Sequence, residues 1–166
     1  MNSLIAIDSI RLVLILTLAY LAAYDFRTFR LPDAITLPLM AMGLIINGLG
    51  NVGFASLDDS IAGAVIGYLL FWSSNYLYRL VKKQNGIGMG DAKLLAALGA
   101  WFGWDALPGI LLIASTSGLL GGLIWLKFQG QSLRSAFPFG PFLAFAGIIE
   151  LLWPQLQTIL RLSTPT

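Results

Sequence analysis

The sequence predicts an all-α, polytopic membrane protein, a bundle of about six transmembrane helices that forms one domain over residues 1–166. Of its residues 57% are hydrophobic and only 11% are charged, whereas soluble domains carry about 25% charged residues. The mean hydropathy is +0.80. Apolar stretches recur from one end of the chain to the other, so a single soluble core does not account for them. We therefore expect membrane lipid to cover the helices.

Six apolar stretches are expected to form the helices, at 4–24, 34–50, 60–80, 92–106, 107–126 and 139–160. Short segments rich in charge, Pro and Asn separate them. The first has no basic residue before Arg11 and no small-residue cleavage site, so we expect a retained helix. Asp8 and Arg11 are spaced to pair on it.

The fourth stretch is unusually short. A helix from Asp91 to Trp104 would measure about 20 Å, against an apolar bilayer core of about 30 Å. We expect its Asp91 end to stop below the membrane surface, because the preceding Gly-rich segment can form irregular backbone beside a watery cavity.

Three pairs of glycines have the small-xxx-small spacing that allows helix backbones to approach closely. They are Gly63 and Gly67, Gly99 and Gly103, and Gly118 and Gly122. Close helix packing accounts for them without any further function.

The basic residues predict the orientation. The first, third and fifth connections hold eight of the ten Lys and Arg residues: Arg27, Arg30, Arg79, Lys82, Lys83, Lys93, Lys127 and Arg134. The second and fourth connections hold Asp58, Asp59 and Asp105 with no Lys or Arg. The positive-inside rule therefore places the three basic connections in the cytoplasm and both termini outside.

The composition excludes several kinds of chemistry. Cys and His are both absent from the sequence, which removes disulfides, thiolate nucleophiles, His-dependent triads and the usual zinc ligand sets. The formal net charge is only +2, so we expect no nucleic-acid partner. Carboxylates are the remaining candidates for acid–base chemistry.

Three aspartates lie at helix boundaries on the predicted cytoplasmic side: Asp25, Asp33 and Asp91. Asp33 follows Pro32, and we interpret it as a helix cap or turn residue. Asp91 could also cap a helix, and Asp25 could pair with Arg27 or Arg30.

Asp25 and Asp91 form the strongest catalytic candidate. They belong to helices far apart in sequence that end at the same predicted membrane face. Two adjacent carboxylates can share one proton, so that one activates water as a base while the other acts as an acid toward a carbonyl. Gly88 and Gly90 leave room beside Asp91 for an extended peptide. This chemistry requires no cofactor and no metal.

At these residues the sequence resembles the type IV prepilin peptidases, a family of GxGD membrane aspartyl proteases. The matching segments are Tyr24-Asp25, Leu31-Pro32-Asp33, Thr36 through Leu39, Gly88-Met89-Gly90-Asp91, Lys93, and Pro138-Phe139-Gly140-Pro141-Phe142. They extend from about residue 20 to about residue 145. GxGD alone is a weak pattern, but its combination with the other segments is specific.

The resemblance implies an endopeptidase of the bacterial inner membrane that removes leader peptides from prepilins or pseudopilins at the cytoplasmic face. Asp25 and Asp91 would be its catalytic residues, with Gly88, Gly90, Asp33 and Lys93 as supporting positions. Larger members carry an N-terminal region with paired CxxC motifs and also methylate the new N-terminus. This chain has no Cys, so it resembles the short, peptidase-only form, and neither methyltransferase activity nor a bound metal is expected.

Three other interpretations remain open. A small ion- or proton-coupled transporter could use Asp25, Asp91 and Glu150 to line a path, although Glu150 could simply be protonated or bonded within its helix. A non-catalytic assembly subunit would use the glycines for packing and the aspartates as caps. A hydrolase could instead hold a hard metal between Asp25, Asp33 and Asp91.

Overall fold

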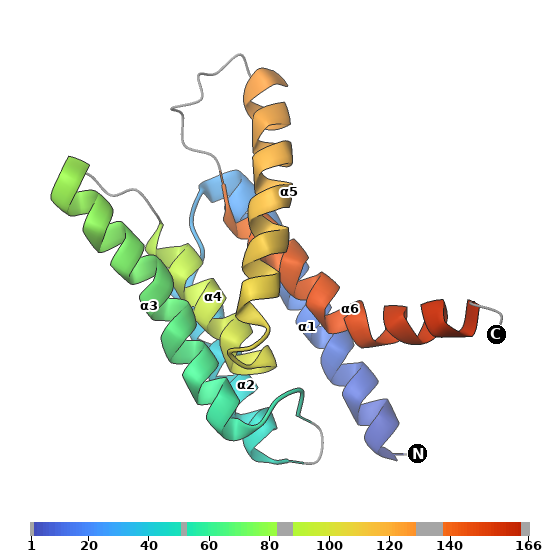
Figure 1. Ribbon diagram of the computed structural model, residues 1–166. Helices are drawn as coiled ribbons and strands as arrows, with labels where there is room; N and C mark the ends of the chain where they lie inside the picture. The colour runs from blue at the N-terminus through green and yellow to red at the C-terminus, as the bar shows by residue number, and fades with distance from the viewer. Residues whose placement is uncertain (1, 51–52, 83–87, 129–137, 164–166) are drawn as a thin grey trace.

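The computed structural model describes residues 2–50, 53–82, 88–128 and 138–163, and in these ranges the chain is all helical (Figure 1). The six helices found there are α1 (Asn2–Thr28), α2 (Asp33–Gly48), α3 (Leu57–Lys82), α4 (Met89–Phe102), α5 (Leu107–Phe128) and α6 (Gly140–Ser163). Each predicted apolar stretch corresponds to one helix. The all-α class is therefore confirmed.

Consecutive helices run in alternating directions (Figure 1). The last turns of α1, α3 and α5 and the first turns of α2, α4 and α6 consequently lie toward the upper end of the bundle in that view. The candidate aspartates belong to this end, because Asp25 is near the end of α1 and Asp91 is near the start of α4.

Helix α4 is the buried centre of the bundle. It packs against α2, α3, α5 and α6, and its residues from Leu94 to Phe102 are all buried. The contact with α3 is backbone on backbone: a Cβ added to Gly63 or to Gly99 would overlap the other residue's backbone, and one added to Gly67 would lie 2.8 Å from the Leu95 carbonyl oxygen. Close packing is thus confirmed for these three glycines.

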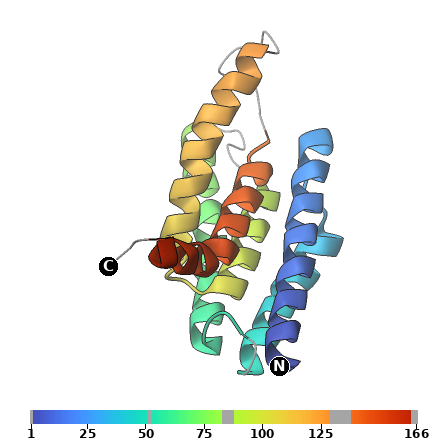
Figure 2. The same cartoon turned by 90° about the vertical axis from the view of Figure 1, so that its right-hand side faces the viewer.

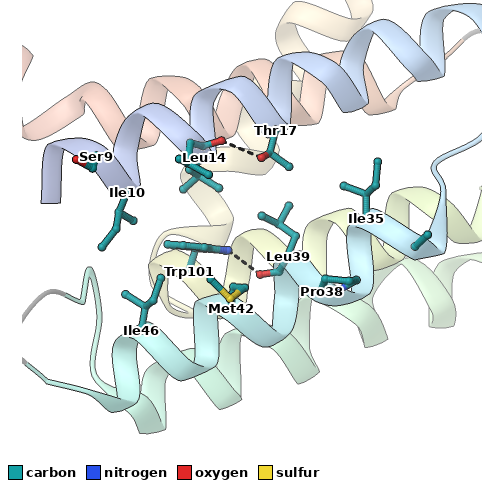
Figure 3. A pocket seen from close by; sticks show the side chains of 12 residues that line it. Ser9, Ile10, Leu14, Thr17, Ile35, Pro38, Leu39, Met42, Ile46 and Trp101 are labelled. Carbon is teal, nitrogen blue, oxygen red and sulfur yellow. Dashed lines mark hydrogen bonds between the residues drawn. The ribbon is translucent and has the colours of Figure 1, made fainter. Parts of the chain in front are cut away.

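Helix α1 packs against α6, as Figure 2 shows from the side. Between α1 and α2 lies a largely apolar groove of about 440 Å³ (Figure 3). It is bordered by residues from Ser9 to Thr17 on α1 and from Ala34 to Ile46 on α2, with Trp101 of α4 also lining it. The Trp101 indole N–H donates to the Leu39 carbonyl oxygen at 2.8 Å, which fixes the ring against α2.

Two of the described helices are long and apolar enough to cross a membrane by themselves, over Ile5–Thr28 and Leu107–Ile124. Helix α2 and the Gly140–Pro154 part of α6 are apolar but shorter. The described structure therefore contains two helices that could cross a membrane. A bundle of six membrane-spanning helices remains a prediction.

Two predicted boundaries are wrong in ways that affect the site. Helix α1 continues to Thr28, past the expected end at residue 24, so Asp25 lies inside the helix rather than after it. Helix α4 begins at Met89 and ends at Phe102, ahead of the expected end at residue 106. Gly103 ends it because its φ of 86° suits glycine and breaks the helical path.

Candidate active site

Asp25 lies in the last turn of α1 and is only 4% exposed. The last backbone hydrogen bond of this turn runs from the Phe29 N–H to the Asp25 carbonyl oxygen at 2.8 Å. Phe29 then departs from the helical path with a φ of 53°. A non-glycine residue in this left-handed region is uncommon and costs free energy. The chain therefore turns sharply just after the buried carboxylate.

The start of α6 supplies the hydrogen-bond partner of Asp25. The Gly140 N–H donates to Asp25 Oδ2 at 3.1 Å. Gly140 is the first residue of α6, where N–H groups lack intrahelical acceptors and the helix dipole is positive. The N–H of Gly140 therefore holds the Asp25 carboxylate against the start of α6.

A side chain at position 140 would not fit. A Cβ added to Gly140 would lie 2.7 Å from Asp25 Oδ2, closer than a real Cβ approaches. The segment from Pro138 to Phe142 is part of the family resemblance, but its sequence alone did not predict this role for Gly140. A glycine between two aromatic residues and two prolines was the signal that could have indicated it.

Asp91 is the third residue of α4 and does not cap it. The cap position is Gly88, no side-chain cap bond is made, and the Asp91 N–H donates to the Gly88 carbonyl oxygen at 3.1 Å. Asp91 precedes the apolar stretch 92–106, and burial raises the pKa of its carboxyl to about 7, with the negative charge of Asp25 as the second cause. The two carboxylates are therefore close enough to interact, and Asp91 can hold a proton near neutral pH.

The two aspartates line one cavity of about 280 Å³, together with Phe29, Arg30, Leu31, Asp33, Gly88, Met89 and Gly90. Gly90 permits a close approach of two segments, because a Cβ there would lie 3.0 Å from Leu31 Cβ. At Gly88 a Cβ would lie 3.4 Å from Asp91 Oδ2, so glycine leaves the space beside this carboxylate open.

Asp33 and Lys93 meet at the edge of this cavity. Lys93 Nζ lies 2.6 Å from both Asp33 Oδ1 and Asp33 Oδ2. The prediction that Asp33 caps α2 is wrong: the cap residue is Pro32, and no side-chain cap bond is made. The Asp33 carboxylate bonds to the Lys93 ammonium group instead of the N–H groups of its own helix.

The predicted alternative partners of Asp25 are not found. Among the described residues the ion pairs are Asp33–Lys93 and Asp8–Arg11, so neither Arg27 nor Arg30 pairs with Asp25. The Asp8–Arg11 pair on α1 is confirmed at 3.4 Å.

The residues named in the transporter and metal-hydrolase interpretations do not gather at this cavity in the way that those interpretations require. Glu150 is not in the cavity; its Oε2 would lie 4.0 Å from a Cβ at Gly109 in the first turn of α5. Over the described part of the chain, no three His, Cys, Asp or Glu side chains are grouped as metal ligands would be. Asp25, Asp33 and Asp91 are all described, so their arrangement does not favour the metal hydrolase.

Known proteins resemble this chain over most of its length. It is 50% identical over 123 residues to a prepilin leader peptidase/N-methyltransferase of Stutzerimonas stutzeri, covering 74% of this chain and 42% of the relative. A protein of the same name from Aeromonas salmonicida is 44% identical over 153 residues, 92% of this chain and 52% of the relative. The chain thus spans about half the length of the curated relatives it matches.

No solved structure matches the chain significantly. A family model described as the type IV leader peptidase family matches residues 12–126. That range includes Asp25, Asp33, Asp91 and Lys93, and it covers most of the helical bundle. The chain belongs to the type IV leader peptidase family.

Proposed function

We propose that this chain is a membrane-embedded aspartyl endopeptidase that removes the leader peptides of prepilin-like proteins at the cytoplasmic face of the bacterial inner membrane. The observation that carries the proposal is the pair Asp25 and Asp91, which come from α1 and α4 to one cavity of about 280 Å³. Family membership supports the substrate class.

The surroundings of the two carboxylates give each a role. Asp25 accepts the Gly140 N–H at the start of α6, a hydrogen bond that stabilises the ionised carboxylate against the opposite and larger effect of its burial. Asp91 has its pKa raised to about 7 by burial and by the charge of Asp25, so it carries the shared proton. Asp25 is then the general base and Asp91 the general acid.

The reaction follows from these protonation states. Asp25 takes a proton from a water molecule as the oxygen of that water bonds to the scissile carbonyl carbon, and Asp91 donates its proton to the carbonyl oxygen. The product of this step is a neutral tetrahedral diol. Asp25 next gives its proton to the amide nitrogen as the carbon–nitrogen bond breaks, and Asp91 recovers a proton from one diol hydroxyl. The starting state of the pair is restored, and no metal or cofactor takes part.

Leader removal from a co-expressed prepilin-like substrate, followed by gel shift, tests the proposal. We expect Asp25→Asn and Asp91→Asn to lower cleavage by at least about 1000-fold, because each removes one half of the acid–base pair. Both variants should remain in the membrane at the wild-type level. Asp33→Asn should retain measurable cleavage, because Asp33 makes no proton transfer in this scheme.

Two outcomes would contradict the assignment. One is full cleavage by Asp25→Asn or Asp91→Asn; the other is no cleavage by the wild type across several prepilin-like substrates. Absence of cleavage by the wild type would return the non-catalytic assembly subunit to consideration. The matched family and the names of the relatives give no support to the transporter interpretation.

A further inference from the structure

The Asp33–Lys93 ion pair joins two segments that are 60 residues apart in the sequence. Asp33 is the first residue of α2 and Lys93 is the fifth residue of α4, two residues beyond Asp91. Lys93 Nζ reaches both carboxylate oxygens at 2.6 Å. One nitrogen atom therefore contacts the whole carboxylate group, and the ion pair links the start of α2 to the first turns of α4.

A second contact links the same two segments. Leu31, two residues before Asp33, lies against the first turn of α4, where a Cβ on Gly90 would come 3.0 Å from Leu31 Cβ and 3.3 Å from its backbone nitrogen. The ion pair and this packing contact flank the position of Asp91 in the sequence. Both hold the start of α4 against the connection between α1 and α2.

That connection is short and begins directly after Asp25. The Phe29 N–H is bonded to the Asp25 carbonyl oxygen, and only residues 29–32 separate α1 from α2. The start of α2 is therefore tied closely to the last turn of α1, where Asp25 lies. A restraint between Asp33 and Lys93 consequently restrains Asp25 relative to Asp91.

We propose that the Asp33–Lys93 ion pair is a positioning clamp, which sets the separation of the two catalytic carboxylates. This inference rests on the proposed peptidase function. A displacement of a catalytic group by about 1 Å can cost about 100-fold in rate. The ion pair is partly solvent-exposed, with side-chain exposures of 26% for Lys93 and 57% for Asp33, so its direct contribution to stability is small. Its role is geometric.

The test separates kcat from KM in detergent-solubilised full-length protein with a synthetic leader peptide substrate. We expect Asp33→Asn and Lys93→Met each to lower kcat by about 10- to 100-fold, with KM within about twofold and the thermal midpoint within a few degrees of wild type. The reversed pair, Asp33→Lys with Lys93→Asp, should recover kcat to within about fivefold of wild type. Asp8→Asn is the matched control, because it breaks the Asp8–Arg11 pair within α1 and should leave kcat unchanged.

Several results would overturn the clamp. They are single variants whose kcat stays within twofold of wild type, a loss expressed in KM alone, and a reversed pair no better than the single variants. If a single variant fails to accumulate, Lys93→Arg keeps the charge and supplies the test: kcat within about fivefold supports the clamp, and a complete loss overturns it. These failures differ from failure of the peptidase proposal, in which the wild type itself cleaves nothing.

Discussion

At the scale of single residues, the two catalytic candidates differ in what surrounds them. Asp25 accepts a hydrogen bond from the backbone N–H of Gly140 at the start of α6. Asp91 shares its cavity with Gly88 and Gly90 and is followed by the apolar residues of α4. The two identical side chains therefore interact with different groups of the protein. The difference in surroundings makes the pair asymmetric before any substrate binds.

This asymmetry predicts how cleavage depends on pH. Since the pKa of Asp91 is raised to about 7, the shared proton is lost as the pH rises through that value, and kcat should fall about tenfold per pH unit above it. Steady-state cleavage at saturating peptide, measured from pH 5 to pH 9, gives the profile. A kcat that stays constant to pH 9 would contradict the role of Asp91 as acid.

The same pKa predicts a stability effect with a definite sign. The folded protein binds the Asp91 proton more tightly than the unfolded chain, whose aspartate pKa is near 3.8. The free energy of unfolding should therefore fall as the pH rises from about 4 to about 7, by at most about 4 kcal/mol. Asp91→Asn should lessen this fall, and thermal unfolding at pH 5 and pH 8 measures it. An identical pH dependence in both proteins would contradict the raised pKa.

At the scale of helices, one buried side chain joins three of them. Asn47, near the end of α2, is 3% exposed. Its Nδ2 donates to Ser60 Oγ of α3 at 2.7 Å and to the carbonyl oxygens of Ala100 and Trp101 of α4 at 3.0 and 2.9 Å. Its Oδ1 accepts the Phe54 N–H at 2.7 Å. This residue satisfies backbone groups at the end of α4 opposite Asp91.

Truncation of this side chain should be costly. We expect Asn47→Ala to lower the free energy of unfolding by about 2–4 kcal/mol, because buried donors and acceptors lose their partners. Thr116→Ala is the control: the Thr116 hydroxyl is exposed and bonds only to carbonyls of its own helix, so the change should stay within about 0.5 kcal/mol. Thermal unfolding in detergent compares them, and equal effects would contradict the role given to Asn47.

The helices and the pairing of the two aspartates could be predicted from the sequence, whereas the hydrogen bonds and the ion pair between helices could not. Apolar stretches and basic connections are local signals, and they located each helix and brought Asp25 and Asp91 to one end. Asn47 bonds to carbonyls 53 and 54 residues away, and any residue type presents a carbonyl. The wrong cap prediction for Asp33 has the same origin, because its partner Lys93 is 60 residues away.

At the scale of the whole molecule, the short length of α4 explains why this helix does not qualify alone as a membrane span. Helix α4 has 14 residues, which amounts to about 21 Å against an apolar layer of about 30 Å. Its surface is covered by α2, α3, α5 and α6, so lipid does not have to cover it. The start of such a short central helix lies below the ends of its longer neighbours α3 and α5 (Figure 1). Asp91, near this recessed helix start, lines the cavity of about 280 Å³, in which we propose that the peptide and water meet the two aspartates.

The orientation of the bundle is the last prediction, and single cysteines can test it because the chain has none. The up-and-down arrangement puts the last turns of α1, α3 and α5, which carry Arg27, Arg79 and Lys127, at the end that holds Asp25 and Asp91 (Figure 1), so this end should face the cytoplasm. Lys83 and Arg134, which also belong to the predicted basic connections, lie outside the described residues. Asp58→Cys, in the first turn of α3, should react with a membrane-impermeant maleimide in intact spheroplasts. Thr28→Cys, at the end of α1, should react only after the membrane is permeabilised.

The two cysteines report on different parts of the prediction. Reaction of both in intact spheroplasts would mean that α2 does not cross the membrane, which contradicts the six-span bundle but leaves the cavity intact. The inverse pattern would place the two aspartates outside, where a leader peptide not yet exported could not reach them. The expected pattern puts the two carboxylates in the cytoplasm, where the leader peptide is present before export. The proposed cleavage reaction and the distribution of basic residues then require the same orientation of the bundle.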